Sequence, residues 1–166
     1  QMLGFELPLN FDAPYKAADI MEFWDRWHMT LTRFFTRYLY IPLGGSRRGR
    51  LRTYINCLIV FLVSGIWHGA GAQFVIWGLL HGGLFVLTRM WKDFRGNSPG
   101  LESGLSKASA LSAGVFHALR VLLTFLYVNI AWIFFCLPSV KEALALLQTI
   151  GSFSFGRINR ELAGCF

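Results

Sequence analysis

Residues 53–88 form a stretch of 36 residues that contains no Asp, Glu, Lys or Arg. A continuous helix of that length would be about 54 Å long, whereas the hydrocarbon core of a bilayer is only about 30 Å thick. Gly69 and Gly71 interrupt the stretch near its middle, and basic residues flank both of its ends. A hairpin that returns to one side of a membrane requires that arrangement. We therefore expect a broken helix pair over residues 53–90, with two short or tilted helices that meet at or near His68, a re-entrant hairpin being one form of it.

The chain is too apolar for an ordinary soluble domain. Hydrophobic residues make up 54% of it and its mean hydropathy is +0.45, whereas a soluble domain of this size carries far more surface charge. The net charge of +7 is concentrated at residues 26–37, 47–52 and 89–95, each beside an apolar segment. That placement favours anionic lipid headgroups and the positive-inside rule over nucleic acid. We therefore predict an all-α, polytopic integral membrane protein that contacts the lipid bilayer and no nucleic acid.

One amphipathic helix is predicted for residues 19–41. Asp19 and Glu22 have the spacing of a capping box, and Pro42 disfavours helical geometry in the residue before it. On an ideal helix the aromatic residues form one face and the arginines the opposite face, which is typical of a helix that lies in the membrane interface. His28 lies at the margin of the aromatic face, and its plainest interpretation from residue chemistry is an interfacial histidine bonded to backbone.

Turn residues and apolar runs divide the rest of the chain. The opening residues are typical of a loop inside a longer protein, so we expect a single, partial membrane domain over residues 1–166. The other predicted segments, in chain order, are a loop at 1–18, a polar connector at 92–110, a transmembrane helix at 111–137 and a short amphipathic helix at 139–150.

His68 lies near the middle of the uncharged stretch, in the sequence Trp67-His68-Gly69. Histidine is one of the few side chains that transfer protons near neutral pH, and a titratable group at membrane depth is by default a candidate functional site. A neutral imidazole there can act as a general base that activates a substrate hydroxyl towards an activated acyl group. Nothing in the sequence indicates a Ser-His-Asp triad. A proton relay in a transporter and a hydrogen-bonded packing histidine agree equally well with the residues alone.

His81 follows 13 residues later and is predicted to be structural. On an unbroken helix it lies about 20 Å from His68 and on another face, so the two share a site only if the glycines fold the chain back. We expect its ring to be hydrogen-bonded within the helix packing. Gly78, Gly82 and Gly83 beside it predict close contact between helices.

The sequence contains no evident site for a metal or a tightly bound cofactor. Cys57, Cys136 and Cys165 are widely spaced and form no cluster with histidine. The basic loop around Arg47 and Arg48 lacks the glycine spacing of a Walker loop. Its plainer interpretation is a cytoplasmic positive flank, and the alternative is attraction of a phosphate-bearing donor.

Several motifs, in order along residues 3–150, resemble those of the membrane-bound O-acyltransferase family. The chain is most similar to the bacterial branch that includes alginate O-acetyltransferase and the D-alanyl transfer protein for teichoic acids, and it resembles roughly the later third of these longer proteins. The motifs are Phe23-Trp24-Asp25-Arg26-Trp27-His28, Tyr40-Ile41-Pro42-Leu43-Gly44-Gly45, Thr53-Tyr54-Ile55-Asn56, Gly65-Ile66-Trp67-His68-Gly69, Trp77-Gly78-Leu79-Leu80-His81-Gly82 and Ala131-Trp132-Ile133-Phe134-Phe135.

The resemblance implies an enzyme that transfers an acyl group, acetyl in the first instance, to hydroxyls of an extracellular polysaccharide such as alginate. It implies that His68 is the catalytic base and that His28 is a second functional histidine, which positions a substrate or polarises the reacting carbonyl. The site is implied to lie in a funnel or tunnel that the donor enters from the cytoplasmic side and the polysaccharide from the other. Further candidate substrate-binding residues are Trp24, Trp27, Trp67, Asn56, Arg47 and Arg48.

The resemblance also implies a cellular setting. The enzyme would lie in the bacterial inner membrane, with periplasmic or extracellular O-acetylation proteins as partners. Its acyl donor, acetyl-CoA or an acyl carrier thioester, would be a co-substrate and no cofactor would be bound. Two rival functions agree with the residues: a transporter or channel subunit that uses His68 as a proton relay, and a non-catalytic scaffold for envelope assembly.

Overall fold

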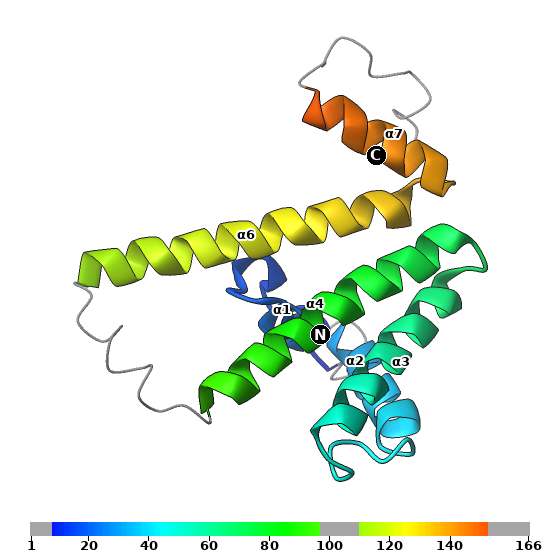
Figure 1. Cartoon of the computed structure of the whole chain (residues 1–166), viewed down its shortest axis with the longest axis vertical. Helices are drawn as coiled ribbons and strands as arrows, with labels where there is room; N and C mark the ends of the chain where they lie inside the picture. The colour runs from blue at the N-terminus through cyan, green and yellow to red at the C-terminus, as the bar shows by residue number, and fades with distance from the viewer. Residues whose placement is uncertain (1–7, 97–109, 153–166) are drawn as a thin grey trace, which may run out of the picture.

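The computed structural model describes residues 8–96 and 110–152, and every regular element in these ranges is a helix (Figure 1). Three helices are long and apolar enough to cross a membrane, which confirms the prediction of an all-α, polytopic membrane protein. They are α3 (Arg50–His68), α4 (Ala72–Gly96) and α6 (Ala110–Cys136). The predicted polar connector lies outside the described residues from position 97 to 109.

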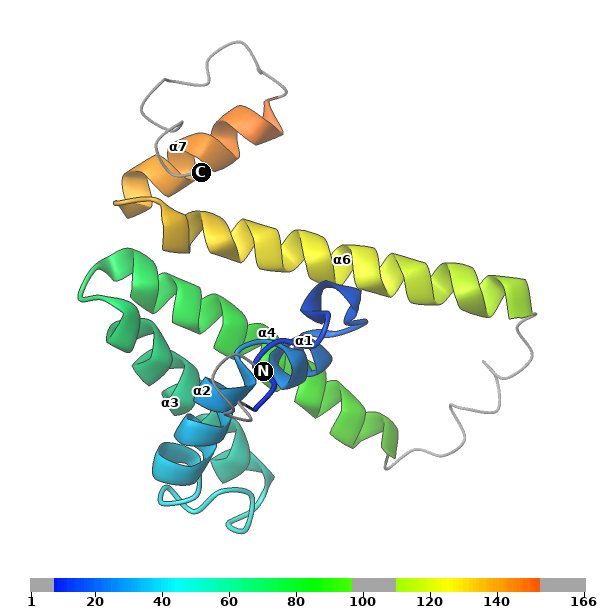
Figure 2. The same ribbon diagram turned by 180° about the vertical axis from the view of Figure 1, so that it is seen from behind.

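Helices α3 and α4 form an antiparallel hairpin that turns at residues 69–71 (Figures 1 and 2). The break predicted near His68 is confirmed, because His68 is the last residue of α3. Both helices extend beyond the predicted limits, since α3 begins at Arg50 and α4 continues to Gly96. Basic side chains permit this extension because their charged ends reach water while their stems stay on apolar surface. Neither helix is therefore short.

Glycines allow the two helices of this hairpin to approach closely. A Cβ atom on Gly78 would lie 2.6 Å from the carbonyl oxygen of Phe61, and one on Gly82 would lie 2.8 Å from the Phe61 Cβ. At Gly83, in contrast, nothing lies within 4 Å of the Cβ position. The prediction of close contact is thus confirmed for Gly78 and Gly82 and is wrong for Gly83.

The prediction of one continuous helix over residues 19–41 is wrong. Between two shorter helices Trp27 is extended, and His28 has left-handed backbone angles of φ 46° and ψ 48°. Residues 10–12 hydrogen-bond to the free backbone groups at both helix ends, and these bonds offset the helical ones that the break removes. The segments, in chain order, are α1 (Ile20–Arg26), α2 (Met29–Phe35) and a π-helical turn η2 (Thr36–Tyr40).

Asp19 fixes the start of α1 and ties it to two long helices. One carboxylate oxygen accepts hydrogen bonds from the amides of Met21 and Glu22, 3.0 Å each. The Glu22 carboxylate accepts a hydrogen bond from the backbone amide of Ala18. In a capping box it would accept one from the amide of Asp19, so the predicted capping box is shifted by one residue. The other Asp19 oxygen lies 2.8 Å from Lys92 Nζ in α4 and 3.4 Å from Arg120 Nη2 in α6. Burial opposes ionisation of Asp19, but the bonds from Lys92 and the two amides outweigh it and lower the pKa of this carboxyl.

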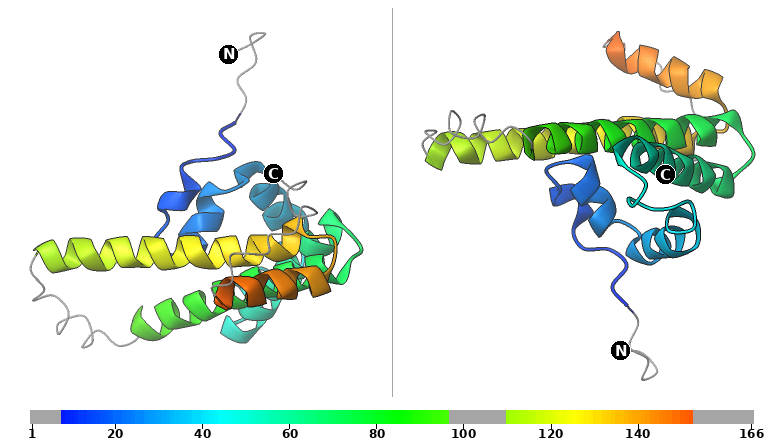
Figure 3. Two further views of the ribbon diagram at one scale, coloured as in Figure 1. Left: turned by 90° about the horizontal axis from the view of Figure 1, so that it is seen from above. Right: turned by 60° about the horizontal axis from the view of Figure 1, so that its bottom comes forward.

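The three long helices form a layer, which the right-hand view of Figure 3 shows edge-on. A short 3₁₀ turn, η1 (Pro14–Lys16), lies with α1 and α2 on one face of the layer, and α7 (Val140–Gly151) lies on the other. Helix α6 occupies the segment predicted as a transmembrane helix. Helix α7 occupies the predicted short amphipathic helix, and the Ser139 hydroxyl caps it by accepting a bond from the Glu142 amide. The buried core lies between α1, α4 and α6 and includes Phe23, Trp24, Trp77, Val128, Ala131 and Phe134.

Candidate functional site

His28 and His68 line one cavity of about 500 Å³, although 40 residues separate them in the sequence. His28 is at the α1–α2 break and His68 at the end of α3, and the α3–α4 hairpin and the packing of α1 on α4 bring these positions together. Tryptophan and phenylalanine rings form most of the remaining wall. They are Trp24, Trp27, Trp77, Trp132 and Phe135.

The His68 ring is half-buried and is held on three sides by aromatic rings. Its centroid lies 4.9 Å from that of Trp67, 5.5 Å from that of Trp77 in α4, and 4.9 Å from that of Phe135 in α6. All three contacts are close to edge-on, which is a favoured geometry for aromatic pairs. Gly69, the next residue, leaves room for the Phe74 ring, which would have to move if a Cβ atom were added there.

His28 is also half-buried, and its ring lies 5.6 Å from that of Phe11. Its Nδ1 atom is buried and has no hydrogen-bond partner among the described residues. Residue chemistry alone suggested a histidine that is hydrogen-bonded to the backbone, and no such bond is found for this nitrogen among the described residues. The arrangement leaves both rings of the His28–His68 pair on the wall of a chamber that a substrate carbonyl and hydroxyl can occupy.

Trp24 and Trp27, predicted as substrate contacts, line the same cavity. Trp67 does not: its side chain is 62% exposed, although its ring contacts that of His68. Arg47 and Arg48 are exposed in the loop after η2 and lie outside this cavity. The location of the two arginines does not test whether they attract an anionic donor, and that role stays a prediction.

Asn56 is fully buried in α3 and holds a loop. Its Nδ2 donates hydrogen bonds to the carbonyl oxygens of Gly45, at 2.9 Å, and Leu43, at 3.4 Å. Gly45 has a positive φ of 55°, a conformation that favours glycine, and the bond from Asn56 secures this turn. The fully buried Asn56 side chain thus has a structural role in this loop, and its predicted substrate contact stays a prediction.

His81 is buried completely among aromatic rings. Its ring centroid lies 4.8 Å from that of Trp77 and 5.2 Å from that of Trp24. Neither ring nitrogen has a hydrogen-bond partner among the described residues, so the expected bond within the helix packing is not found. The glycine turn does fold the chain back, and Trp77 contacts both His81 and His68. His81 itself does not line the cavity of His28 and His68.

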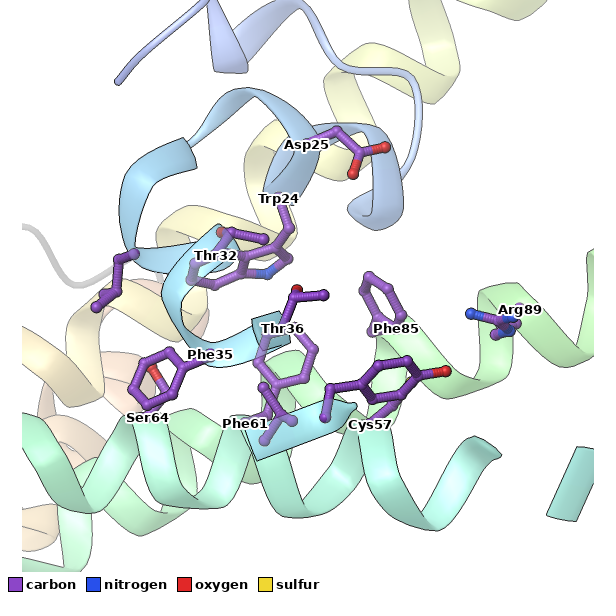
Figure 4. Close-up of a pocket in the computed structure, with 13 residues that line it drawn as sticks. Trp24, Asp25, Thr32, Phe35, Thr36, Cys57, Phe61, Ser64, Phe85 and Arg89 are labelled. Carbon is purple, nitrogen blue, oxygen red and sulfur yellow. The ribbon is translucent and has the colours of Figure 1, made fainter. Parts of the chain in front are cut away.

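A second cavity, of about 220 Å³, lies beside the first and was not predicted from the sequence (Figure 4). Trp24, Leu31 and Ser64 line both cavities, so the two are neighbours that share a wall. From Ser64 the second cavity follows α3 for two turns, about 10 Å, to Cys57. The residues that line it along α3 are Cys57, Val60, Phe61 and Ser64, a spacing that puts them on one helical face.

The second cavity is mostly apolar but has two charged residues in its wall. Arg89, in α4, lies at the side opposite Ser64 in Figure 4. Asp25, in α1, lines another part of the wall, and desolvation raises the pKa of its carboxyl although the Lys92 charge opposes this shift. Small and polar residues on one face of an otherwise apolar helix, Cys57 and Ser64, are the sequence signal that could have indicated this space.

Among residues 8–96 and 110–152, no group of three His, Cys, Asp or Glu side chains is placed to hold a metal ion. The chemistry that this part of the chain offers is that of two imidazoles beside apolar walls. Imidazole accepts and donates protons near neutral pH.

Comparison with known proteins identifies the family. Residues 2–137 match the profile of the membrane-bound O-acyltransferase family, MBOAT. The chain is 42% identical to a peptidoglycan O-acetyltransferase of Helicobacter pylori over 150 residues, which are 87% of this chain and 25% of that protein. It is 35% identical to the probable alginate O-acetylase AlgI of Pseudomonas aeruginosa over 93% of this chain and 26% of that protein. A teichoic acid D-alanyltransferase of Streptococcus thermophilus is 29% identical over 54% of this chain and 23% of that protein. The chain spans about a quarter of the length of these relatives, and it belongs to the membrane-bound O-acyltransferase family.

Proposed function

We propose that the protein of which this chain is a part transfers an acetyl group from an activated thioester to a hydroxyl of an exported or cell-envelope glycan. The observation that carries this proposal is the single cavity lined by both His28 and His68. Family membership supports acyl transfer as the type of reaction. The names of the relatives support glycan hydroxyls as acceptors.

In the proposed reaction His68 acts as the general base. Its neutral imidazole takes the proton of the acceptor hydroxyl while the oxygen attacks the thioester carbonyl carbon. The new C–O bond forms, the C–S bond breaks, and the departing thiolate takes the proton back from the imidazolium. His28, on the same cavity wall, donates a hydrogen bond to the carbonyl oxygen as negative charge develops there. The products are an ester and a free thiol, and His68 ends neutral.

The two adjoining cavities support separate routes for the two substrates. The second cavity is mostly apolar and is lined along two turns of α3, which suits the thin arm of a thioester such as acetyl-CoA or an acyl carrier protein. It shares Trp24, Leu31 and Ser64 with the His28–His68 cavity, so an acyl group at this wall would meet both imidazoles. Arg89, at its far end, supplies a positive charge for a donor that carries phosphate. The donor therefore enters along α3 and the glycan enters the larger cavity.

Two acceptors are candidates, and the comparisons favour them to different degrees. Alginate follows from the similarity to probable alginate O-acetylases at 34–36% identity. Peptidoglycan follows from the higher identity of 42% to a peptidoglycan O-acetyltransferase. With either acceptor, the proposal has the protein in the bacterial inner membrane, the donor or its carrier protein on the cytoplasmic side and O-acetylation partner proteins outside.

The test uses the full-length protein in its own host. Ester-linked acetyl released by mild base is measured separately on purified peptidoglycan and on exopolysaccharide, for wild type and His68→Ala at matched membrane levels. Loss of acetyl from one polymer at unchanged polymer yield is expected, and the polymer affected identifies the acceptor. His117→Ala, which changes an exposed histidine outside both cavities, is the matched control and should retain acetylation.

The rival functions predict other results. If His68→Ala leaves acetyl on both polymers unchanged, acyl transfer by His68 is refuted. A transporter would instead give donor-independent flux of protons or substrate in vesicles, abolished by the same substitution. A scaffold would tolerate glutamine at both His28 and His68, provided that the protein still accumulates.

A further inference from the structure

The segment Asn10-Phe11-Asp12 brackets the break between α1 and α2. The Asp12 amide donates a hydrogen bond to the carbonyl oxygen of Arg26, the last residue of α1, at 2.9 Å. The Asn10 carbonyl oxygen accepts one from the amide of Met29, the first residue of α2, also at 2.9 Å. One short segment therefore satisfies free backbone groups on both sides of Trp27 and His28.

The Asn10 side chain provides the cap that α2 lacks. His28 is the N-cap residue of α2 by position, and its side chain makes no capping bond. Asn10 Oδ1 instead accepts hydrogen bonds from the Thr30 amide at 3.1 Å and from the Thr30 hydroxyl at 2.8 Å. An N-cap side chain ordinarily accepts the bond from the second or third helical amide, and Thr30 is the second residue of α2. The capping bond thus comes from 20 residues earlier in the chain, and the His28 ring is left for the cavity.

His28 needs this support because its backbone is left-handed. A residue with a Cβ atom rarely adopts φ near 46°, and such a conformation persists only where the surroundings hold it. The bonds from Asn10 and Asp12 fix the chain on either side of it. The Phe11 ring adds packing, with its centroid 5.0 Å from that of Trp27 and 5.6 Å from that of His28.

We propose that Asn10 is a positioning residue of the acyl-transfer site, which aims the His28 ring at the cavity by capping α2 in place of His28. This inference rests on the function proposed above. Loss of the cap lets the left-handed turn relax, and the His28 ring then leaves its place in the wall of the cavity that it shares with His68. A misplacement of about 1 Å in a catalytic group can cost roughly 100-fold in rate. We expect Asn10→Ala to lower acetyl transfer by about 10- to 100-fold.

The test measures acetyl transfer per folded molecule in the full-length protein. The folded fraction is the monodisperse peak in size-exclusion chromatography, and the assay temperature is kept well below every thermal midpoint. Asn10→Asp keeps the acceptor oxygen and should retain wild-type activity per folded molecule, whereas Asn10→Ala should lose most of it. A role in stability alone would lower the thermal midpoint of Asn10→Ala and leave activity per folded molecule unchanged, and that result would overturn the inference.

A second pair of variants tests the role of Asn10 if Asn10→Ala fails to accumulate. Thr30→Val removes only the hydroxyl bond to Asn10, and Thr149→Val removes a hydroxyl bond of similar length, 2.9 Å, within α7. Activity per folded molecule should fall in Thr30→Val and not in Thr149→Val, and equal activity in the two overturns the inference. His68→Ala is assayed beside them. If it retains acetylation, the proposed function itself has failed, whereas an inactive His68→Ala beside fully active Asn10→Ala and Thr30→Val refutes only the role of Asn10.

Discussion

The close contact between α3 and α4 gives a prediction whose magnitude follows from the structure. A Cβ atom on Gly78 would lie 2.6 Å from the Phe61 carbonyl oxygen, which is 0.8 Å short of the 3.4 Å at which ordinary contact begins. The opposing atom is backbone, so Gly78→Ala forces the two helices apart or bends one of them. Overpacking of this kind costs about 1–3 kcal/mol. The new alanine also gains about 1 kcal/mol in helix propensity over glycine.

Gly83→Ala is the matched control, because it lies in the same helix and nothing is within 4 Å of its Cβ position. It has the same gain in helix propensity without the steric cost, so the propensity cancels between the two variants. Gly78→Ala should therefore be less stable than Gly83→Ala by about 1–3 kcal/mol. The measurement is the thermal midpoint of the full-length protein in detergent micelles, followed by circular dichroism. A midpoint for Gly78→Ala equal to or above that of Gly83→Ala would refute the reasoning.

Substitutions at three other positions have expected outcomes in the same assay. Asp19→Ala should cost about 2 kcal/mol, and Asp19→Asn, which keeps the capping oxygen but loses the charge facing Lys92, about half of that. Because the pKa of Asp19 is lowered below 3.8, the contribution of its charge is constant at neutral pH and is lost as the pH falls through the depressed pKa. A stability difference between wild type and Asp19→Asn that does not shrink as the pH is lowered below 3.8 would contradict this. Asn56→Ala leaves the Gly45 carbonyl without its donor and should lower stability by about 1–3 kcal/mol, with wild-type stability as the contrary result. His81→Phe removes two buried nitrogens without described partners and should leave stability unchanged or raise it, so a loss above about 2 kcal/mol would show that the imidazole makes a bond to a buried water.

The α3–α4 hairpin was predictable because its signals are local. An uncharged stretch too long for one span, interrupted by Gly69 and Gly71, admits few other structures, and the turn lies at residues 69–71. The break at Trp27 and His28 was not predictable in this way. No glycine or proline marks it, and the local pattern agrees with a continuous helix through residue 41. The deciding hydrogen bonds come from residues 10–12, and such tertiary contacts override helix propensity.

The candidate site was predictable only in part. Residue chemistry alone indicated His68, whereas family resemblance was needed to select His28, and the structure places both on one cavity wall. The sequence pattern gives no sign that His28, at a helix break, and His68, at the end of another helix 40 residues later, lie at the same cavity. The hydrogen bonds of Asn10 and Asn56 could not be predicted for a similar reason, since their partners lie 20 and 11 residues away in the sequence. The catalytic roles of the two histidines stay predictions.

The wall around His68 has a consequence for how the protein is made in the cell. His28, His68 and the whole α3–α4 hairpin are synthesised before Trp132 and Phe135, which follow His68 by more than 60 residues. The hairpin closes through its own short turn, so it can form while α6 is still on the ribosome. The chamber cannot be complete until α6 has inserted beside α4 and delivered its two aromatic rings. Translation order thus delays completion of the cavity until after both of its histidines have been synthesised, and a nascent chain arrested before α6 would carry both histidines without the Trp132 and Phe135 wall.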